Sequence, residues 1–185
     1  MKKGNFGYIK SARKRSVVRT AIYFSISLLL FITGYISTGT RMNLLTVAAV
    51  LGCLPASKSA VNMIMLFKAG LCSQECFEKI QPVTAGTFVL YDLYLTAYQK
   101  NYQISVMAIK GNALCCYTED EKCEISSGEK HIETVLEQGG YKGYTVKIFT
   151  GFDKFYERLV QLQKLDEKKE EKYKAIAEII KDVSL

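Results

Sequence analysis

Val17–Ser37 reads VVRTAIYFSISLLLFITGYIS and contains no charged side chain after Arg19. The segment from Thr20 to Ser37 would rise about 27 Å as an α-helix, close to the ~30 Å thickness of a bilayer's hydrocarbon core. Seven Lys or Arg residues precede it. A secretory signal peptide also has a basic start and an apolar run, but its core is shorter and ends in a small-residue cleavage site. We therefore expect a retained membrane helix.

A second apolar region follows after a short polar turn. Met42–Leu54 is apolar, Pro55 interrupts the run, and Ala60–Phe67 is apolar again. A helix from Asn43 to Lys58 would climb about 24 Å, so that the Lys58 ammonium could snorkel to the opposite interface. Pro55 would bend this helix, with a nearby serine hydroxyl satisfying the freed carbonyls.

Lys58 has a second interpretation as a charge that lines a substrate or ion path inside the membrane. Two helices cannot enclose a path by themselves, so this reading requires an oligomer or a partner. It describes an oligomeric transport or channel subunit centred on Pro55 and Lys58.

The charge pattern indicates the orientation of the two helices. The residues before Glu75 include ten Lys or Arg and no Asp or Glu, whereas the remainder holds 15 Lys or Arg and all 18 Asp or Glu. The two parts therefore carry +10 and −3. Seven of these cations precede the first helix, against Arg41 alone in the turn, so the positive-inside rule predicts that both termini are cytoplasmic and the turn is outside. We expect a multi-pass plasma-membrane protein, and a Trp-free, Lys-, Ile- and Tyr-rich composition is compatible with a bacterial one.

Basic residues beside an apolar helix attract anionic lipid headgroups. Phe6 and Tyr8 lie among these cations, a pattern that is also found in RNA-binding segments. A nucleic-acid-binding domain should carry its own basic surface, however, and the part of this chain after Glu75 is slightly acidic. We therefore expect an anionic bilayer and not nucleic acid as a partner, with membrane-interface residues Arg13, Lys14, Arg15, Arg19, Pro55 and Lys58.

The chain divides into a basic cytosolic N-terminus (residues 1–16), a transmembrane helical hairpin (17–69) and a cytosolic domain (70–185). The domain is large enough for one compact core. Alternating apolar residues predict strands over 86–96, 102–109, 113–118 and 143–149. Helical spacing predicts the other elements, and we expect an α+β fold in the order α–β–β–β–α–β–α–α.

The same patterns predict which side chains point inward. In the first strand Val89, Tyr91, Leu93 and Leu95 should share a face, and in the second Ile104, Val106 and Ala108 should. A capping box of Ser126 and Glu129 should open the helix that ends near Gln138, with Ile132, Val135 and Leu136 inward. Tyr173, Ile176, Ile180 and Val183 would either dock onto the sheet or form a short coiled coil.

From Leu71 to Phe149 the order of elements resembles the core of the restriction-endonuclease-like, PD-(D/E)xK, nuclease family: a helix, a three-strand meander, a helix and a strand. The resemblance implies two carboxylates that converge on a divalent metal ion. The available residues are Asp92, Asp120, Glu121 and Lys122, but Asp92 falls in the first strand and the other three lie beyond the third. The resemblance is topological only, and a degenerate relative fits it better than an active nuclease.

Other chemistry finds little support in the sequence. Cys72, Cys76, Cys115, Cys116, Cys123 and His131 lack the paired spacing of zinc knuckles, and Cys115 and Cys116 point to opposite faces of a strand. We interpret them as reduced packing thiols and expect no disulfide, metal or cofactor. No strand-to-helix junction carries a phosphate-binding glycine pattern.

The sequence thus indicates location better than activity. We expect a small membrane protein whose cytosolic domain binds a protein partner without catalysis, through an exposed apolar patch formed by Tyr94, Tyr98 and Tyr102. The alternatives are a membrane-tethered metal-dependent nuclease or phosphodiesterase and the transport subunit above. Homo-oligomerisation stays open.

Overall fold

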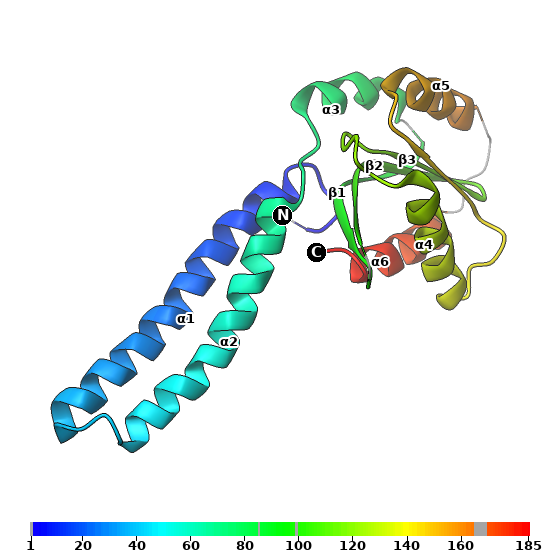
Figure 1. The fold of residues 1–185 in the computed structure, drawn as a ribbon. Coiled ribbons are helices and arrows are strands. Elements are labelled where there is room, and N and C mark those ends of the chain that lie inside the picture. Colours follow the sequence, from blue (N-terminus) through cyan, green and yellow to red (C-terminus); the bar gives the residue numbers. More distant parts are fainter. Residues whose placement is uncertain (1, 85, 99, 165–169) are drawn as a thin grey trace. The chain divides into compact units, whose positions relative to one another are not determined.

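The computed structural model describes residues 2–84, 86–98, 100–164 and 170–185 (Figure 1). The chain forms two compact units. We call Ile9–Lys68 the helical unit, and Met1–Tyr8 together with Ala69–Leu185 the α+β unit. The first eight residues therefore belong to the same unit as the C-terminal part of the chain, although a long helical hairpin separates them in sequence.

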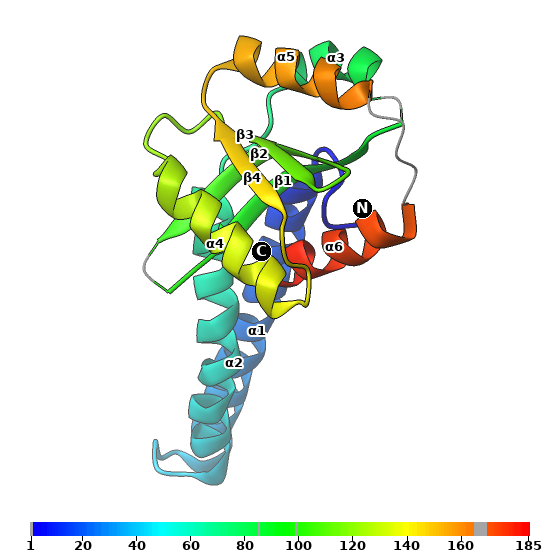
Figure 2. The ribbon, with the colours of Figure 1, turned by 90° about the vertical axis from the view of Figure 1, so that its right-hand side faces the viewer.

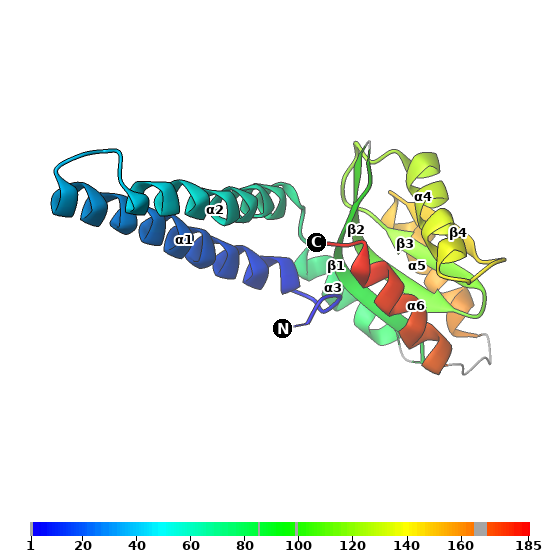
Figure 3. The ribbon, with the colours of Figure 1, turned by 90° about the horizontal axis from the view of Figure 1, so that it is seen from below.

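The helical unit is an antiparallel pair, α1 (Tyr8–Thr38) and α2 (Leu44–Lys68), which lie side by side (Figure 3). Both helices are long and apolar enough to cross a membrane. Only 17% of each apolar window is buried, whereas the core helix of a soluble protein would be mostly buried. Large apolar side chains such as Leu28, Leu29 and Leu54 are instead exposed.

Small side chains line the contact between α1 and α2. Thr20 on α1 and Ser59 on α2 are buried, and their hydroxyl oxygens lie 2.8 Å apart in a hydrogen bond. A Cβ added to Gly52 would lie 2.7 Å from Ser27 Oγ, so the two backbones approach closely there. Close approach of small residues and hydroxyl hydrogen bonds are typical of helix pairs in lipid.

The α+β unit contains a four-stranded mixed sheet in the order β1-β2-β3-β4. The first two pairings are antiparallel and the β3–β4 pairing is parallel. The strands are β1 (Phe88–Thr96), β2 (Asn101–Lys110), β3 (Ala113–Tyr117) and β4 (Thr145–Phe149). The other described elements are α3 (Gln74–Ile80), a 3-10 turn (Gln81–Val83), α4 (Ile125–Gln138), α5 (Phe152–Gln163) and α6 (Glu170–Asp182). The predicted α+β class and order of elements are confirmed.

Helices cover both faces of this sheet (Figure 2). α4 and α6 pack on one face, where Leu136 and Ile176 are fully buried against strand residues. α3 and α5 pack on the other face, where Ile80 and Phe155 are fully buried. The inward positions predicted for α4 are confirmed, and α6 docks onto the sheet.

The predicted alternation in the first two strands is wrong, because both strands change phase at the same level. Leu93 and Leu95 face the α4–α6 core while Val89 and Tyr91 face the α3–α5 core, and Ile104 is similarly separated from Val106 and Ala108. Asp92 lies between the two halves of β1 with a left-handed φ of 52°, the one non-glycine residue with positive φ among those described. A residue in this conformation reverses the facing of the side chains that follow it.

The predicted capping box of α4 is also wrong. The N-cap is Glu124 and makes no side-chain cap hydrogen bond, so Ser126 lies inside the helix. Glu129 instead uses Oε1 to accept the backbone N–H of Ile148, at 3.0 Å. That N–H belongs to the edge strand β4, so the carboxylate satisfies a donor that an edge strand would otherwise expose.

The other sheet edge, β1, is covered by both ends of the chain. Tyr91 N donates to Gly4 O at 2.8 Å, and Leu185 N donates to Tyr94 O at 3.0 Å. Lys3 Nζ lies 2.8 Å from Ser184 O, which joins the two terminal segments to each other. The N-terminal segment is therefore an integral part of the α+β unit.

Replacing Ile176 by Ala should destabilise the α+β unit by about 2–4 kcal/mol, because a fully buried side chain leaves a cavity. We expect the melting temperature of the full chain in detergent micelles, followed by near-ultraviolet circular dichroism, to fall by roughly 10 °C. Lys174→Ala, on the exposed side of the same helix, should change it little. An unchanged melting temperature for I176A, with an altered oligomeric state, would instead support the coiled-coil interpretation of this helix.

Candidate functional site

Asp92 is the buried charged centre of the α+β unit. Its side chain is 3% exposed. One carboxylate oxygen accepts the N–H of Gly7 at 2.7 Å, and the other accepts the N–H of Cys72 at 2.8 Å. Gly7 immediately precedes α1 and Cys72 closely follows α2, so one carboxylate holds both chain segments that connect this unit to the hairpin.

The pKa of Asp92 reflects two opposing effects. Burial raises the pKa because it penalises the charged form, while the backbone N–H groups of Cys72, Gly7 and Tyr8 lower it. Burial has the larger effect. Aromatic packing secures the same segment, since the Phe6 ring stacks on Phe77 at 4.2 Å between ring centroids.

The residues of the nuclease alternative occupy different settings. Asp92 uses both carboxylate oxygens to bind backbone N–H groups. Asp120 lies in the turn after β3, where its Oδ1 accepts the N–H of Lys122 at 3.0 Å, and Glu121 is exposed. Within the described ranges, no group of three or more His, Cys, Asp or Glu side chains is placed to hold a metal ion. The nuclease assignment stays a prediction.

A polar hollow of about 260 Å³ lies between α3 and α5. We call it the α3–α5 hollow; its lining residues are Ser73, Glu75, Cys76, Lys79, Tyr117, Glu119, Phe152 and Asp153. Glu119 holds the start of α3, since its Oε1 accepts the Ser73 hydroxyl at 2.6 Å. Tyr117 and Phe152 form an edge-to-face aromatic pair with centroids 5.7 Å apart. The hollow therefore combines carboxylates with an aromatic wall.

All six cysteines are free thiols. Cys72 and Cys76 form a buried pair in which the hydrogen bond between the thiols raises the pKa of Cys72 and lowers that of Cys76. Burial raises the pKa of Cys115 and of Cys116, which point to opposite faces of β3 as predicted. These side chains pack in the two cores.

His131 is half-buried on α4. Burial lowers the pKa of its imidazole. Its ring lies 5.6 Å from the Tyr102 ring between centroids, and its Nε2 has no hydrogen-bond partner among the described residues. His131 therefore packs against Tyr102, and its partial burial favours the neutral imidazole.

The predicted tyrosine patch is not formed as expected. Tyr98 is exposed, but Tyr102 is 5% exposed and its hydroxyl lies 2.7 Å from Ser127 Oγ. Among the described residues of the α+β unit, Tyr98 and Ile125 are the large apolar side chains with high exposure. The described part of this unit therefore has no cluster of highly exposed large apolar side chains at the predicted position.

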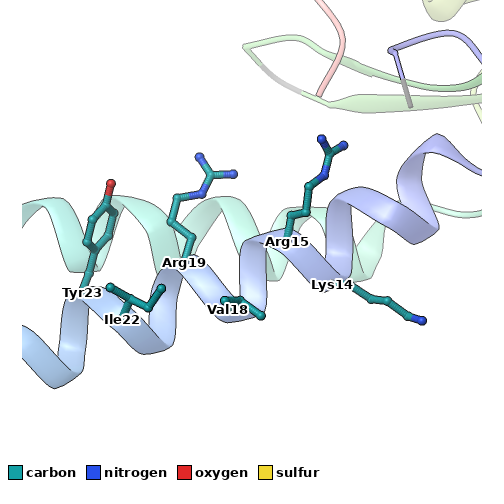
Figure 4. Close-up of a pocket in the computed structure, with 6 residues that line it drawn as sticks. All are labelled: Lys14, Arg15, Val18, Arg19, Ile22 and Tyr23. Atoms are coloured by element: carbon teal, nitrogen blue, oxygen red, sulfur yellow. The ribbon is translucent and has the colours of Figure 1, made fainter.

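Most charges of the helical unit lie near one end of the hairpin, and Arg41 lies in the turn at the other end. Figure 4 shows that the guanidinium groups of Arg15 and Arg19 and the hydroxyl of Tyr23 point to the same side of α1, whereas Lys14 points elsewhere. Their four-residue spacing places them one above another on a helix face. Together with Val18 and Ile22, these residues line a hollow of about 440 Å³.

A second hollow lies between the two helices of this unit. It has a volume of about 390 Å³, and we call it the Arg19–Lys58 groove; its lining residues are Arg19, Tyr23, Pro55, Lys58, Ser59 and Asn62. Of the residues predicted at the membrane interface, the structure brings Arg19, Pro55 and Lys58 together here. Arg13 lies on α1 before Arg19 and contacts α2, where its Nε donates to Leu66 O at 2.9 Å.

Pro55 lies inside α2, which continues to Lys68 on its far side. The Ser57 hydroxyl donates to Cys53 O at 2.8 Å, and the Ser59 hydroxyl is engaged with Thr20 instead. One serine thus bonds a carbonyl near the proline while the other joins the helices.

Sequence reasoning missed the Arg19–Lys58 groove and the α3–α5 hollow. Placing Arg19 beside Lys58 requires the register of α1 against α2. A hydroxyl residue next to a cation in each apolar helix, Thr20 and Ser59, is the sequence feature that could have indicated this register. The role of Asp92 could not be found because its partners, Gly7 and Cys72, are distant in sequence.

Comparison with protein-family models, with curated proteins and with solved structures gives no match for this chain. The function must therefore be argued from the geometry described above.

Replacing Asp92 by Ala should cost roughly 2–4 kcal/mol, because it leaves the buried N–H groups of Gly7 and Cys72 without acceptors. Asp92→Gly loses the same carboxylate but adopts the left-handed φ freely, so it should be about 1 kcal/mol more stable than D92A. Thermal unfolding of the full chain in micelles measures both. Equal stabilities for the two variants would show that the backbone relaxes at this position.

Proposed function

We propose that this chain is a plasma-membrane protein in which α1 and α2 span the bilayer and both termini are cytoplasmic. The observation that carries the proposal is the combination of two long helices with exposed apolar side chains and a first acidic residue only at Glu75. Exposed apolar helices need lipid or a partner to cover them. Of the ten cations before Glu75, nine lie away from the turn and only Arg41 lies in it, which favours a cytoplasmic location of the nine beside an anionic leaflet.

Two features of the helical unit support a common membrane boundary at Arg19 and Lys58. Both line one groove, so they lie at a similar level along the hairpin. Beyond them lie the uncharged stretches Thr20–Ser37 and Asn43–Ser57. The first would rise about 27 Å, which suits the ~30 Å hydrocarbon core.

For the α+β unit we propose a binding role without catalysis. In the α3–α5 hollow Lys79 Nζ pairs with Glu75 Oε1 at 2.7 Å and lies 5.6 Å from the Phe152 ring centroid, and the exposed carboxylate of Asp153 lines the same space. A basic side chain from a partner would bind at Asp153 or replace Lys79. Carboxylates next to aromatic rings suit the stem and charge of a Lys or Arg side chain. The partner we expect is therefore a protein that presents a basic side chain at the cytoplasmic membrane surface.

The element order from α3 to β4 supports a second candidate, a degenerate or active nuclease-like domain. Its metal would have to recruit Asp120, Glu121 and Lys122 from the turn after β3. A transport role for Lys58 would need further copies or a partner to enclose the groove.

Cysteine accessibility tests the proposed topology. Thr40→Cys, in the turn, should react with a membrane-impermeant maleimide on intact cells, and Lys122→Cys should react only after permeabilisation. Both positions are exposed, so side-chain burial does not distinguish them. The background is the chain with Cys123→Ser, because the Cys123 thiol is half-exposed beside Lys122; Cys53 lies in an apolar helix.

Labelling of Lys122→Cys on intact cells would overturn the orientation. Release of the chain from vesicles by alkaline carbonate would overturn membrane insertion itself. Both measurements use the full chain in its own membrane.

A photo-crosslinking residue tests the proposed binding surface. Placed at Glu75 in the α3–α5 hollow, it should form a discrete adduct in intact membranes, while the same residue at the exposed Glu137 of α4 should not. Asp153→Asn should lower the adduct yield by roughly threefold through loss of an ion pair. Adducts from Glu137 alone would move the binding surface to the opposite face of the sheet.

A further inference from the structure

We propose that the Arg19–Lys58 groove binds the phosphate of one anionic phospholipid. The inference rests on the proposed membrane insertion and extends it, because it names a discrete headgroup site in place of a diffuse attraction to charge. The groove has a volume of about 390 Å³, which is room for a phosphate and part of a headgroup.

The chemistry of the lining suits a phosphate diester. The Arg19 guanidinium presents planar, parallel donors that match two phosphate oxygens, and Lys58 adds a compact ammonium. The Tyr23 hydroxyl and the Asn62 amide, which also line the groove, are further donors. Ser59 is held by Thr20 at 2.8 Å, so the floor of the groove is fixed by a contact between the helices.

The charge of the groove lacks compensation from the protein. Within the part of the chain that the structure describes, Arg19 and Lys58 have no ion-pair partner, and no acidic residue occurs before Glu75 in the sequence. Two cations from different helices would repel each other at the edge of a low-dielectric medium. A phosphate between them removes that repulsion, so binding it also stabilises the helix pair.

An apolar hollow beside the groove favours a lipid over a soluble phosphate. Arg19 and Tyr23 line both the groove and the hollow of about 440 Å³ that contains Val18 and Ile22. The two side chains thus separate a polar space from an apolar one. A phospholipid can occupy both at once, with its phosphate in the groove and the start of an acyl chain along Val18 and Ile22.

Native mass spectrometry of the full chain in detergent micelles measures the binding. The probes are phosphatidylglycerol and phosphatidylcholine with identical acyl chains. Both lipids carry a phosphate diester, but the quaternary ammonium of phosphatidylcholine would be repelled by Arg19 and Lys58. We therefore expect one phosphatidylglycerol to remain bound with at least about tenfold higher affinity than phosphatidylcholine. Arg19→Gln with Lys58→Gln should abolish that preference.

A matched control separates the groove from general electrostatics. Lys10→Gln with Lys68→Gln removes the same charge from the same helical unit but leaves every lining residue of the groove and of the apolar hollow intact. This pair should lower affinity by no more than about threefold. The charge-conserving pair Arg19→Lys with Lys58→Arg should retain the preference and shows whether loss in the Gln pair reflects misfolding.

Several results would overturn the site. An equal loss of phosphatidylglycerol affinity in the two Gln pairs would mean that lipid is held by diffuse attraction to charge. Displacement of phosphatidylglycerol by millimolar inorganic phosphate would mean that a soluble anion is the occupant. Failure of membrane insertion is seen separately, by alkaline extraction. A chain that stays in the membrane yet binds both lipids equally refutes the groove and leaves the proposed topology standing.

Discussion

The Asp92 carboxylate accepts N–H groups from Gly7 and Cys72, which lie on the two segments that lead into and out of the helical hairpin. Few single side chains could replace it. The acceptor must be small enough for the buried site, must provide two oxygens, and must tolerate φ of 52°. The charged form is costly in this setting, and the hydrogen bonds from fixed backbone groups offset part of that cost.

The same residue explains the two cores of the α+β unit. At Asp92 the side chains of β1 change the face to which they point, and β2 changes at the same level. In the β1–β2 pair, the residues on the two sides of this level therefore alternate in opposite phase between the α4–α6 core and the α3–α5 core. A continuous alternation would have left the carboxylate on an apolar face, away from the chain segments that it binds.

The sequence predicted those parts of the fold that depend on local pattern. The apolar face of α4 and the order of elements are both found. The phase change at Asp92 was not predictable, since an Asp within a β-rich run gives no local indication of left-handed φ. Glu129 was misassigned for a related reason: its partner, the Ile148 N–H, becomes available only because β4 is an edge strand.

Candidate sites were less predictable than the fold because each joins elements that the pattern treats separately. The Arg19–Lys58 groove depends on the register of two helices, which the Thr20–Ser59 hydrogen bond fixes. Arg19 precedes Thr20, and Lys58 precedes Ser59. The hydrogen bond between the two hydroxyls therefore brings the two cations to the same level. A slip of one turn would separate Arg19 and Lys58 by about 5 Å along the helix axes, so that the two cations would no longer line one groove. The hydroxyl contact that packs the helices therefore also determines where the two cations meet.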